Sequence, residues 1–477
     1  MAVRHTQSDG SRVVSVPMKH GRTPPTRWWP WVIAWTVLGL GIRLETVLSN
    51  PHKLAQGDAY FYHYTAHLFV SGHGFINPIA FFGHQAHDVI PTASFPPLFI
   101  FLVAIPAAIG LKSFFIERIF CCILGAAGVL VGGMAGREIA GRRVGLIAAF
   151  LLAVYPNIWM SDQLALSETI APLLVALVLL TTYRFWKVPS VRRALWMGAT
   201  LGVAILGRDE LVLLSVFIIV PMTLAVVRKG WKQRIGLLAA AAAAVVLVLT
   251  PWIGYNLTRF EKPVFVSTGL GVTLASANCA WTYSGEGEGY WYMPCALDYA
   301  NHPSLTGITD ESLRDPILQD LATTWIAKHS DRIVPVAFAK VGRAFGFFHP
   351  MQQIRYDFFI ETRPYKWTVV GLGMYYCLLA LSVGGTVILR RRRIPSFPMW
   401  ALALDVLCAA LLSFGNTRYR TSFEVGLVIM AAVQLQWIWG RLSGSVTIEP
   451  SPFLTSEKGD RSSSEASSFV EAGEGAP

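Results

Sequence analysis

The sequence predicts an all-α membrane protein with about ten transmembrane helices. Of its 477 residues, 53% are hydrophobic and only 14% are charged, whereas about 25% are charged in an ordinary soluble domain. The apolar residues also form runs that are long enough to cross a bilayer, since about 20 helical residues cover a hydrocarbon layer of about 30 Å. A soluble core cannot bury this many apolar side chains, so we expect lipid to surround most of the chain.

Ten apolar runs are expected to cross the membrane. The first follows a polar, arginine-bearing segment and has no small-residue cleavage site after it, so we expect it to be retained as a helix and not removed as a signal peptide. The runs lie at about 29–48, 117–135, 144–157, 169–186, 194–206, 211–227, 235–253, 367–389, 397–414 and 422–440.

The basic residues indicate which helix ends face the cytoplasm. The formal charge is +11, and its lysines and arginines lie in short clusters at the ends of apolar runs, which is typical of topology signals and not of a nucleic-acid site. Segment 96–110 is short and contains three prolines. If it does not cross, every strong basic cluster between helices faces the cytoplasm, whereas a crossing would invert all of them. We therefore expect this segment to dip into the membrane or lie at its surface.

This topology divides the chain into five parts. We expect a disordered cytoplasmic N-terminus and a disordered cytoplasmic tail that is rich in Ser, Glu and Gly. Between them lie a transmembrane catalytic core that includes a first outer loop (49–93), a large extracytoplasmic loop, and C-terminal transmembrane helices. In that order along the chain, the parts are 1–27, 28–253, 254–366, 367–440 and 441–477.

Asp58 is the first candidate catalytic residue. It follows the first predicted helix and is surrounded by Tyr60, Phe61 and Tyr62. An acid held beside the membrane surface is a candidate general base. The alternative is a helix N-cap, because Asp before an apolar-periodic run commonly caps a helix.

Asp162 and Glu168 flank the next predicted outer turn and are candidates for acidic support of the same site. The predicted topology places both on the same side of the membrane as Asp58. Glu168 alternatively begins the following helix, where an acid complements the positive end of the helix dipole.

Three arginines and one histidine are predicted to bind a lipid phosphate. Arg208 lies between two apolar runs, where a charge is costly unless it is paired or faces water, although a tight polar turn explains it equally well. Arg418 and Arg420 lie in an outer turn that the positive-inside rule disfavours for arginine, which indicates an anionic partner that arginine grips bidentately. His349, near the end of the large loop, is expected to join them, with a structural role as its alternative.

The large loop also contains Cys279 and Cys295. If the loop faces an oxidising compartment, the sequence permits a disulfide between them, worth about 3 kcal/mol in the chain-entropy model. The aromatic residues nearby, from Trp281 to Tyr292, suit contacts with sugar rings and equally suit packing on a membrane surface.

Several motifs, taken in order, resemble the GT-C superfamily of integral membrane glycosyltransferases. The likeness is strongest to the bacterial branch related to protein mannosyltransferases and lipid A aminoarabinose transferases. The matching features are Asp58 after the first helix, Ser94-Phe95-Pro96-Pro97-Leu98, residues 141–149 with Tyr155-Pro156, Ser167-Glu168, residues 206–210, and Arg418-Tyr419-Arg420.

The resemblance implies a fold with juxtamembrane helices in the first outer loop and a large outer loop. It implies transfer of a hexose or pentose from a polyprenyl-phosphate carrier, usually with inversion, to a glycan, lipid or protein acceptor outside the cytoplasmic (plasma) membrane. Asp58 would deprotonate the acceptor hydroxyl, and Arg208, Arg418 or Arg420 would steady the leaving phosphate. Membrane lipids are expected partners, and nucleic acids are not.

The sequence departs from the resemblance at one position and leaves other functions open. Several relatives place a second carboxylate directly after the first-loop acid, where this chain has Ala59, so a divalent metal stays possible but unassigned. His84, His87 and Asp88 show no specific ligand spacing. A transporter or flippase of polyprenyl-linked sugars is the alternative function, and it would use Asp405, an acid inside an apolar run. A non-catalytic scaffold would use none of these residues.

Overall fold

The computed structural model describes residues 28–83, 88–227 and 229–443, and within these ranges all the regular secondary structure is helical. Within these ranges, the only β-type pairing is an isolated bridge between Ile76 and Pro91. The predicted all-α fold class is therefore confirmed. The predictions for residues 1–27 and for the tail beyond 443 fall outside the described part of the chain.

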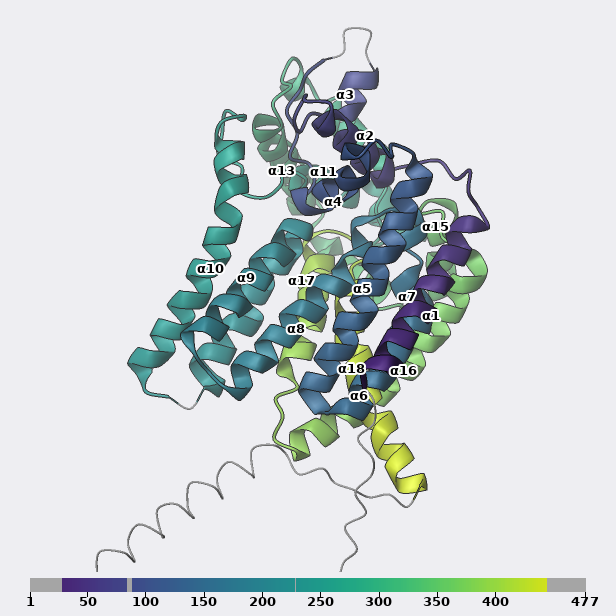
Figure 1. Cartoon of the computed structure of the whole chain (residues 1–477). Coiled ribbons are helices and arrows are strands. Elements are labelled where there is room, and N and C mark those ends of the chain that lie inside the picture. The colour runs from purple at the N-terminus through teal and green to yellow at the C-terminus, as the bar shows by residue number, and fades with distance from the viewer. Residues whose placement is uncertain (1–27, 84–87, 228, 444–477) are drawn as a thin grey trace, which may run out of the picture.

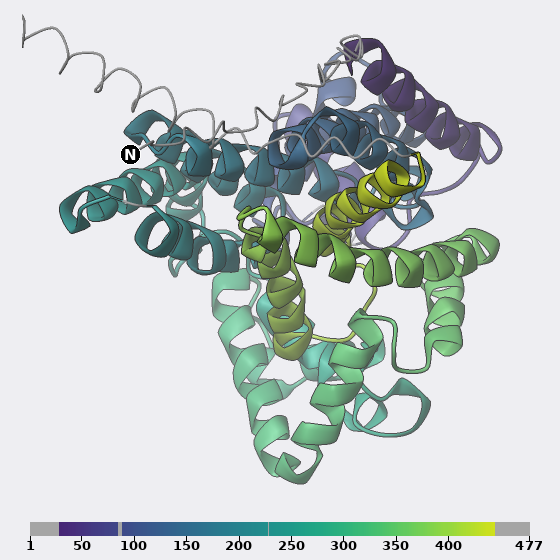
Figure 2. The same ribbon diagram turned by 90° about the horizontal axis from the view of Figure 1, so that it is seen from below.

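Nine α-helices form the main bundle (Figure 1). Helix α5 packs against α1, α6 and α8, while α9 packs between α8 and α10, and α18 packs against α6 and α16. Figure 2 shows α1 in purple and the α9–α10 pair in teal at opposite edges of the bundle. The helices are α1 (Trp28–Leu48), α5 (Phe114–Ala140), α6 (Arg142–Val154), α8 (Ala171–Lys187), α9 (Val191–Gly207), α10 (Trp231–Leu257), α16 (Tyr365–Arg391), α17 (Phe397–Leu412) and α18 (Thr421–Leu442).

Within the described residues, six helical segments are long and apolar enough to cross a membrane, which makes this a multi-pass membrane protein. A seventh span is formed if α6 continues through α7 (Pro156–Trp159) to Leu164 across a bend of 65°. Pro156 explains the bend, because the residue before a proline is driven out of the helical region, and Tyr155 is extended. The predicted count of ten stays a prediction, since the remaining apolar segments are shorter or irregular. The six are Trp28–Leu48, Phe114–Ala140, Ser167–Lys187, Trp231–Leu257, Tyr365–Arg391 and Thr421–Leu442.

The segment at 96–110 and the run that was expected to cross at 211–227 have distinct structures. Helix α4 (Pro97–Ala108) has 12 residues, which span only about 18 Å at the α-helical rise, so it is too short to cross alone. The run predicted to cross at 211–227 is an irregular segment, built from the 3-10 helix η3 (Asp209–Leu213) and the π-helical segments η4 (Ser215–Ile219) and η5 (Met222–Val226).

Close helix approaches hold the bundle together at glycines. A Cβ atom added to Gly198 of α9 would lie 2.0 Å from the carbonyl oxygen of Ala241 in α10. A Cβ atom on Gly385 of α16 would lie 1.9 Å from the carbonyl oxygen of Met430 in α18. Small residues of this kind let membrane helices pack backbone to backbone.

The first outer segment and the large loop lie together at one end of the bundle (Figure 1). Glu311 ties them to each other, because its carboxylate accepts hydrogen bonds from the Thr92 and Ser94 hydroxyls, the Ala93 amide and the Thr268 hydroxyl. The helices of this layer are α2 (Asp58–Val70), α3 (Pro78–Gly83), α11 (Leu270–Ala277), α12 (Met293–Ala300), α13 (Glu311–Lys328), α14 (Ile333–Ala344) and α15 (Pro350–Phe359).

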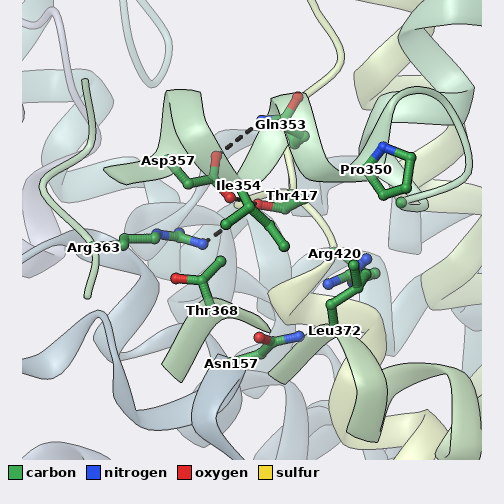
Figure 3. A pocket seen from close by; sticks show the side chains of 11 residues that line it. Asn157, Pro350, Gln353, Ile354, Asp357, Arg363, Thr368, Leu372, Thr417 and Arg420 are labelled. Atoms are coloured by element: carbon green, nitrogen blue, oxygen red, sulfur yellow. Dashed lines mark hydrogen bonds between the residues drawn. The ribbon is translucent and has the colours of Figure 1, made fainter. Parts of the chain in front are cut away.

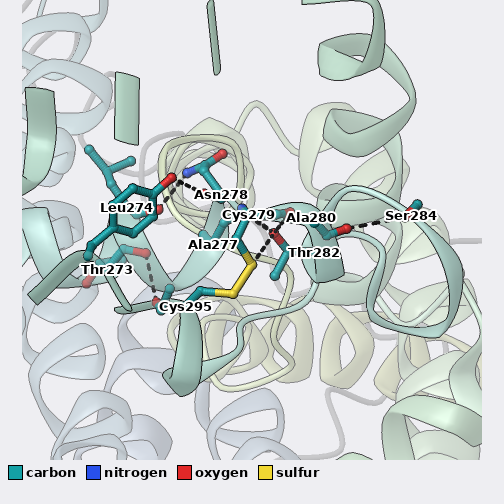
Figure 4. Close-up of a disulfide and its surroundings, with 11 residues drawn as sticks. Thr273, Leu274, Ala277, Asn278, Cys279, Ala280, Thr282, Ser284 and Cys295 are labelled. Atoms are coloured by element: carbon teal, nitrogen blue, oxygen red, sulfur yellow. Dashed lines mark hydrogen bonds between the residues drawn. A yellow bond between two sulfur atoms is a disulfide. The ribbon is translucent and has the colours of Figure 1, made fainter. Parts of the chain in front are cut away.

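A disulfide joins Cys279 to Cys295 inside the large loop (Figure 4). It links the segment after α11 to the first turn of α12, as the sequence permits. The Thr282 hydroxyl donates hydrogen bonds to the carbonyl oxygens of Ala277 and Cys279 beside it. The covalent link therefore reinforces a segment that already has a defined turn.

Candidate active site

Arg418 is the centre of an ion-pair cluster in the turn between α17 and α18. Its Nη2 atom lies 2.7 Å from Oδ2 of Asp58, its Nε atom lies 2.7 Å from Oε1 of Glu168, and its Nη1 atom lies 3.1 Å from Oε2 of Glu361. These residues come from the start of α2, the 3-10 helix η2 (Ser167–Thr169) and the end of α15. One guanidinium thus joins three parts of the chain that are distant in sequence.

A second arginine extends the cluster on its buried side. Arg208 Nη1 lies 2.8 Å from Oε1 of Glu168, and Arg208 Nε lies 2.5 Å from Oε1 of Glu210. Arg208 follows α9 directly, and Glu210 lies in η3. Glu168 is therefore held between two guanidinium groups, which keeps this buried carboxylate ionised.

Asp58 is the most accessible acid of the cluster. Its side chain is 33% exposed, compared with 2% for Glu168 and 6% for Glu361. The N-cap of α2 is Gly57, and Asp58 occupies the first turn without capping the helix. The N-cap interpretation of Asp58 is thus wrong, because its carboxylate is directed to Arg418 instead.

The electrostatics favour a charged Arg418. Burial alone would lower the pKa of its guanidinium, but Glu168, Glu361 and Asp58 raise that pKa well above its ordinary value. Burial raises the pKa of the Glu361 carboxyl, and Arg418 and Arg363 oppose that shift. The cluster holds more carboxyl groups than guanidinium groups, and Asp58 is its most water-accessible carboxyl group.

Asp162 does not belong to this cluster. Its Oδ2 atom lies 2.6 Å from Nε of Arg43 in α1, and both side chains are almost fully buried. The predicted partnership with Glu168 near Asp58 is not what the structure shows, because the chain turns between Asp162 and Glu168 through a left-handed residue, Ala165. Asp162 instead forms an ion pair that connects α1 to the segment after α7.

Arg420 lines a pocket beside the cluster, together with Arg363 (Figure 3). Arg420 pairs with Glu424 at 2.7 Å and stacks on Tyr375, with its Cζ atom 3.8 Å from the ring centroid. Arg363 donates to the Thr417 hydroxyl at 3.4 Å. Both arginines are buried, and Nε and Nη2 of Arg363 and Nη1 of Arg420 have no hydrogen-bond partner among the described residues. Buried, unpaired guanidinium donors of this kind suit an anion.

His349 lies apart from these arginines. It is exposed, it has a left-handed backbone with φ of 42°, and it precedes the first turn of α15. Its ring packs edge-on against the Phe348 ring. The structure brings Asp58, Glu168, Arg208 and Arg418 together, but it does not bring His349 to them.

Sequence reasoning missed Glu361 and Arg363 as members of this region, and it noted Glu210 only as part of the turn at 206–210. The signal for Arg363 was available, since it is an arginine on the predicted outer side, where the positive-inside rule disfavours it. The same argument singled out Arg418 and Arg420. Glu361 had no comparable signal, because an exposed loop normally contains acids.

The carboxylates around Arg418 do not form a free metal site, because each of them contacts a guanidinium. In the described part of the chain, a single group brings three His or acid donor atoms within 4.8 Å of one another, namely His63, His67 and Glu117. His84 and His87 lie outside the described residues.

The helical bundle and its charged cluster define a polytopic membrane protein with a polar site at one end. The comparison with protein families agrees with this class. Residues 94–255 match the family described as Dolichyl-phosphate-mannose-protein mannosyltransferase. The predicted resemblance to the GT-C superfamily is confirmed by this match, which covers about a third of the chain and includes Glu168 and Arg208 but not Asp58 or Arg418.

Two kinds of solved structure align with this chain. The oligosaccharyltransferase AglB from Archaeoglobus fulgidus, solved with an inhibitory peptide and a dolichol-phosphate, is 15% identical and aligns over 89% of this chain and 52% of its own, with a TM-score of 0.49. ArnT from Cupriavidus metallidurans, solved with undecaprenyl phosphate, is 14% identical and aligns over 89% and 81%, with a TM-score of 0.41. This chain thus spans about half the length of AglB. No curated protein matches the sequence.

Proposed function

We propose that this protein is a glycosyltransferase that takes a hexose or pentose from a polyprenyl-phosphate carrier. It transfers the sugar with inversion to a glycan, lipid or protein acceptor on the outer face of the cytoplasmic membrane. The observation that carries the proposal is the accessible Asp58 carboxylate held by Arg418 at the edge of a buried charge cluster. The family match over residues 94–255 supports the general reaction.

The position of the site supports an outer-face reaction. Asp58 begins α2 and Glu361 follows α15, and both helices belong to the layer at the end of the bundle that carries the first outer segment and the large loop (Figure 1). The large loop contains the Cys279–Cys295 disulfide, and disulfides persist mainly in oxidising compartments outside the cytoplasm. The basic clusters at the opposite helix ends agree with a cytoplasmic location for those ends.

Asp58 is positioned to act as the general base. Arg418 contacts Oδ2 of Asp58, which leaves Oδ1 to accept the proton of an acceptor hydroxyl. The acceptor oxygen then attacks the anomeric carbon on the face opposite the phosphate, and the carbon–oxygen bond to the phosphate breaks. The proton passes to Asp58, and the carrier departs as polyprenyl phosphate.

Arg363 and Arg420 are suited to hold that departing phosphate. Arg418 and Arg208 each bind more than one carboxylate. Arg420 binds one carboxylate, that of Glu424, and both Arg363 and Arg420 keep unpaired donors in a neighbouring pocket. Glu361, two residues before Arg363, contacts Arg418, and Arg418 also contacts Asp58. The turn that carries Arg418 therefore lies next to both the pocket and Asp58. Guanidinium donors stabilise the developing phosphate charge and make a separate general acid unnecessary.

The test of this function is sugar transfer by the reconstituted protein. With a panel of radiolabelled polyprenyl-phosphate sugars and membrane acceptors, we expect the wild type to form product. The Asp58→Asn variant is expected to fold normally and to lose about 10²- to 10⁴-fold in turnover, since a general base contributes about that much.

Asp88→Asn is the matched control, because Asp88 is an exposed acid of the same outer segment and lies outside the charge cluster. It is expected to transfer at the wild-type rate. Turnover by Asp58→Asn equal to that of Asp88→Asn would remove Asp58 as the base.

A second prediction concerns the phosphate pocket. Arg363→Met is expected to raise the donor concentration needed for half-maximal transfer by about tenfold, because one charge-assisted contact contributes about 1.5 kcal/mol or more. The measurement is the initial rate against donor concentration, together with binding of the sugar-free polyprenyl phosphate.

Arg355→Met serves as the control for this change, since Arg355 is an exposed arginine of the nearby helix α15. If Arg363→Met and Arg355→Met bind the carrier equally well, the phosphate does not occupy this pocket.

One observation supports the flippase as the alternative function. Asp405 is buried in α17, and both its carboxylate oxygens have no hydrogen-bond partner among the described residues. An acid placed this way in a membrane helix is a functional candidate by default. Movement of labelled carrier across vesicles without any new glycosidic bond, abolished by Asp405→Asn, would favour the flippase over the transferase.

A further inference from the structure

Two histidines and one glutamate converge between the first outer helix and the bundle. His63 and His67 are four residues apart, so they lie on one face of α2. The Nδ1 atom of His63 lies 2.8 Å from Oε2 of Glu117, and the Nε2 atom of His67 lies 2.9 Å from Oε1 of Glu117. Glu117 belongs to the first turn of α5. The three donor atoms all lie within 4.8 Å of one another.

The carboxylate of Glu117 is buried without an arginine or lysine partner. Its side chain is 0% exposed, and no Lys or Arg of the described residues forms an ion pair with it. The adjacent Arg118 is turned away, since it donates to the carbonyl oxygens of Gln163 and Asn50. A buried carboxylate requires a compensating positive charge. That charge comes from a protonated histidine or from a bound cation.

We propose that His63, His67 and Glu117 bind a divalent transition-metal ion of the zinc type. Two imidazole nitrogens and one carboxylate oxygen form a donor set that zinc accepts at about 2.0–2.2 Å, with a fourth position left for water. A tetrahedral ion at those bond lengths separates its ligand atoms by about 3.4 Å, so the present contacts have to open by only about half an ångström. Magnesium is a poor fit, because it prefers oxygen ligands and retains its water.

The surroundings suit a bound ion that remains reachable from water. The side chains of His63 and His67 are 11% and 19% exposed, so water reaches the site from the side of these two histidines. Phe114 packs edge-on against the His63 ring and shields the other side. The site is distinct from the Arg418 cluster, to which none of its three residues contributes.

The ion would connect the first outer helix to the membrane bundle. Asp58 lies in the first turn of α2, five residues before His63, which is about 7.5 Å along a helix axis. Fixing His63 and His67 on α5 therefore fixes the helix that presents Asp58 to Arg418. The three residues are positioning residues for the proposed base and do not touch the reacting atoms.

The test measures metal binding and thermal stability and does not depend on transfer activity. The full-length protein in detergent is treated with EDTA and dialysed, and zinc or magnesium is then added. We expect one zinc per chain by elemental analysis and a rise in Tm of about 3 °C or more with zinc alone, because a ligand that binds only the native state stabilises it. Cobalt is expected to give the visible absorption of a four-coordinate ion.

Variants locate the ion. His67→Gln and Glu117→Gln are expected to weaken zinc binding at least tenfold and to abolish the Tm shift. His73→Gln is the control, since His73 is an exposed histidine that directly follows α2, and it is expected to bind zinc as the wild type does. If Glu117→Gln does not fold, His63→Gln on the partly exposed side of the site replaces it.

Two results would overturn the proposal. The first is less than a tenth of an equivalent of zinc on the wild type at tens of micromolar free metal. The second is unchanged zinc binding in both His67→Gln and His63→Gln. A Tm that responds to pH but not to zinc would assign the compensating charge to a protonated histidine. None of these outcomes bears on whether Asp58 is the catalytic base, so the two proposals fail separately.

Discussion

Arg418→Met is expected to destabilise the protein by about 3 kcal/mol and to reduce transfer to below about one percent of the wild-type rate. The substitution keeps most of the side-chain volume but leaves the buried carboxylates of Glu168 and Glu361 with fewer partners, and breaking a buried ion pair by removing one member is strongly destabilising. It also releases Asp58 from its guanidinium contact with Arg418. Thermal unfolding in detergent and transfer per folded molecule measure the two effects.

Arg418→Lys separates charge from geometry at the same position. The three carboxylates contact three different nitrogens of Arg418, and a single ammonium cannot reproduce that fork. We expect part of the stability to return, without the transfer activity. Arg355→Met is the control for removing an exposed arginine. An Arg418→Met variant that matches it in both measurements would show that the cluster does not organise the site.

Arg43→Met is expected to produce the largest loss of stability outside the site, about 3–5 kcal/mol. Arg43 and Asp162 are both buried, and their contact is 2.6 Å. Removing the arginine leaves an uncompensated charge within the bundle, which is the costly case for a buried pair. The measurement is the midpoint of thermal unfolding in detergent.

The double variant Arg43→Met/Asp162→Asn tests whether this pair is structural. Removing both charges is expected to recover much of the stability lost in Arg43→Met, because contacting residues are not additive in their effects. Transfer per folded molecule is expected to stay near the wild-type level. A fully folded double variant without activity would instead restore Asp162 to the acidic support that the sequence predicted.

The candidate site shows where prediction from residue type succeeds. Each of four residues was singled out for its own reason: Asp58 and Glu168 as acids on the predicted outer side, Arg208 as a costly charge between apolar runs, and Arg418 as an arginine on the side that the positive-inside rule disfavours. The structure supplies their partners from within the same group. The pairing itself was not predictable, since these residues are distant in sequence and any of the outer arginines could have met any of the outer acids.

Because the pairing of charged groups is not predictable from the sequence, the role of Arg363 was missed and Asp162 was placed in the wrong group. Arg363 and Arg420 differ from Arg418 only in what surrounds them, because Arg418 meets three carboxylates while Arg363 keeps two unpaired nitrogens. Asp162 and Glu168 lie six residues apart, yet one faces α1 and the other faces the turn after α17. Residue type and spacing do not report the direction of a side chain in an irregular segment.

The sequence by itself determined that this is an all-helical membrane protein whose polar segments gather at one end. Hydropathy and basic clusters suffice for that, because the bilayer imposes the length of a span and its charge asymmetry locally along the chain. Only the tertiary structure decided which acids are paired, which arginines keep free donors and which histidines share Glu117. Those properties depend on long-range contacts and burial, since the strength of an ionic interaction is set by the distance and the dielectric between groups that meet only in the folded chain.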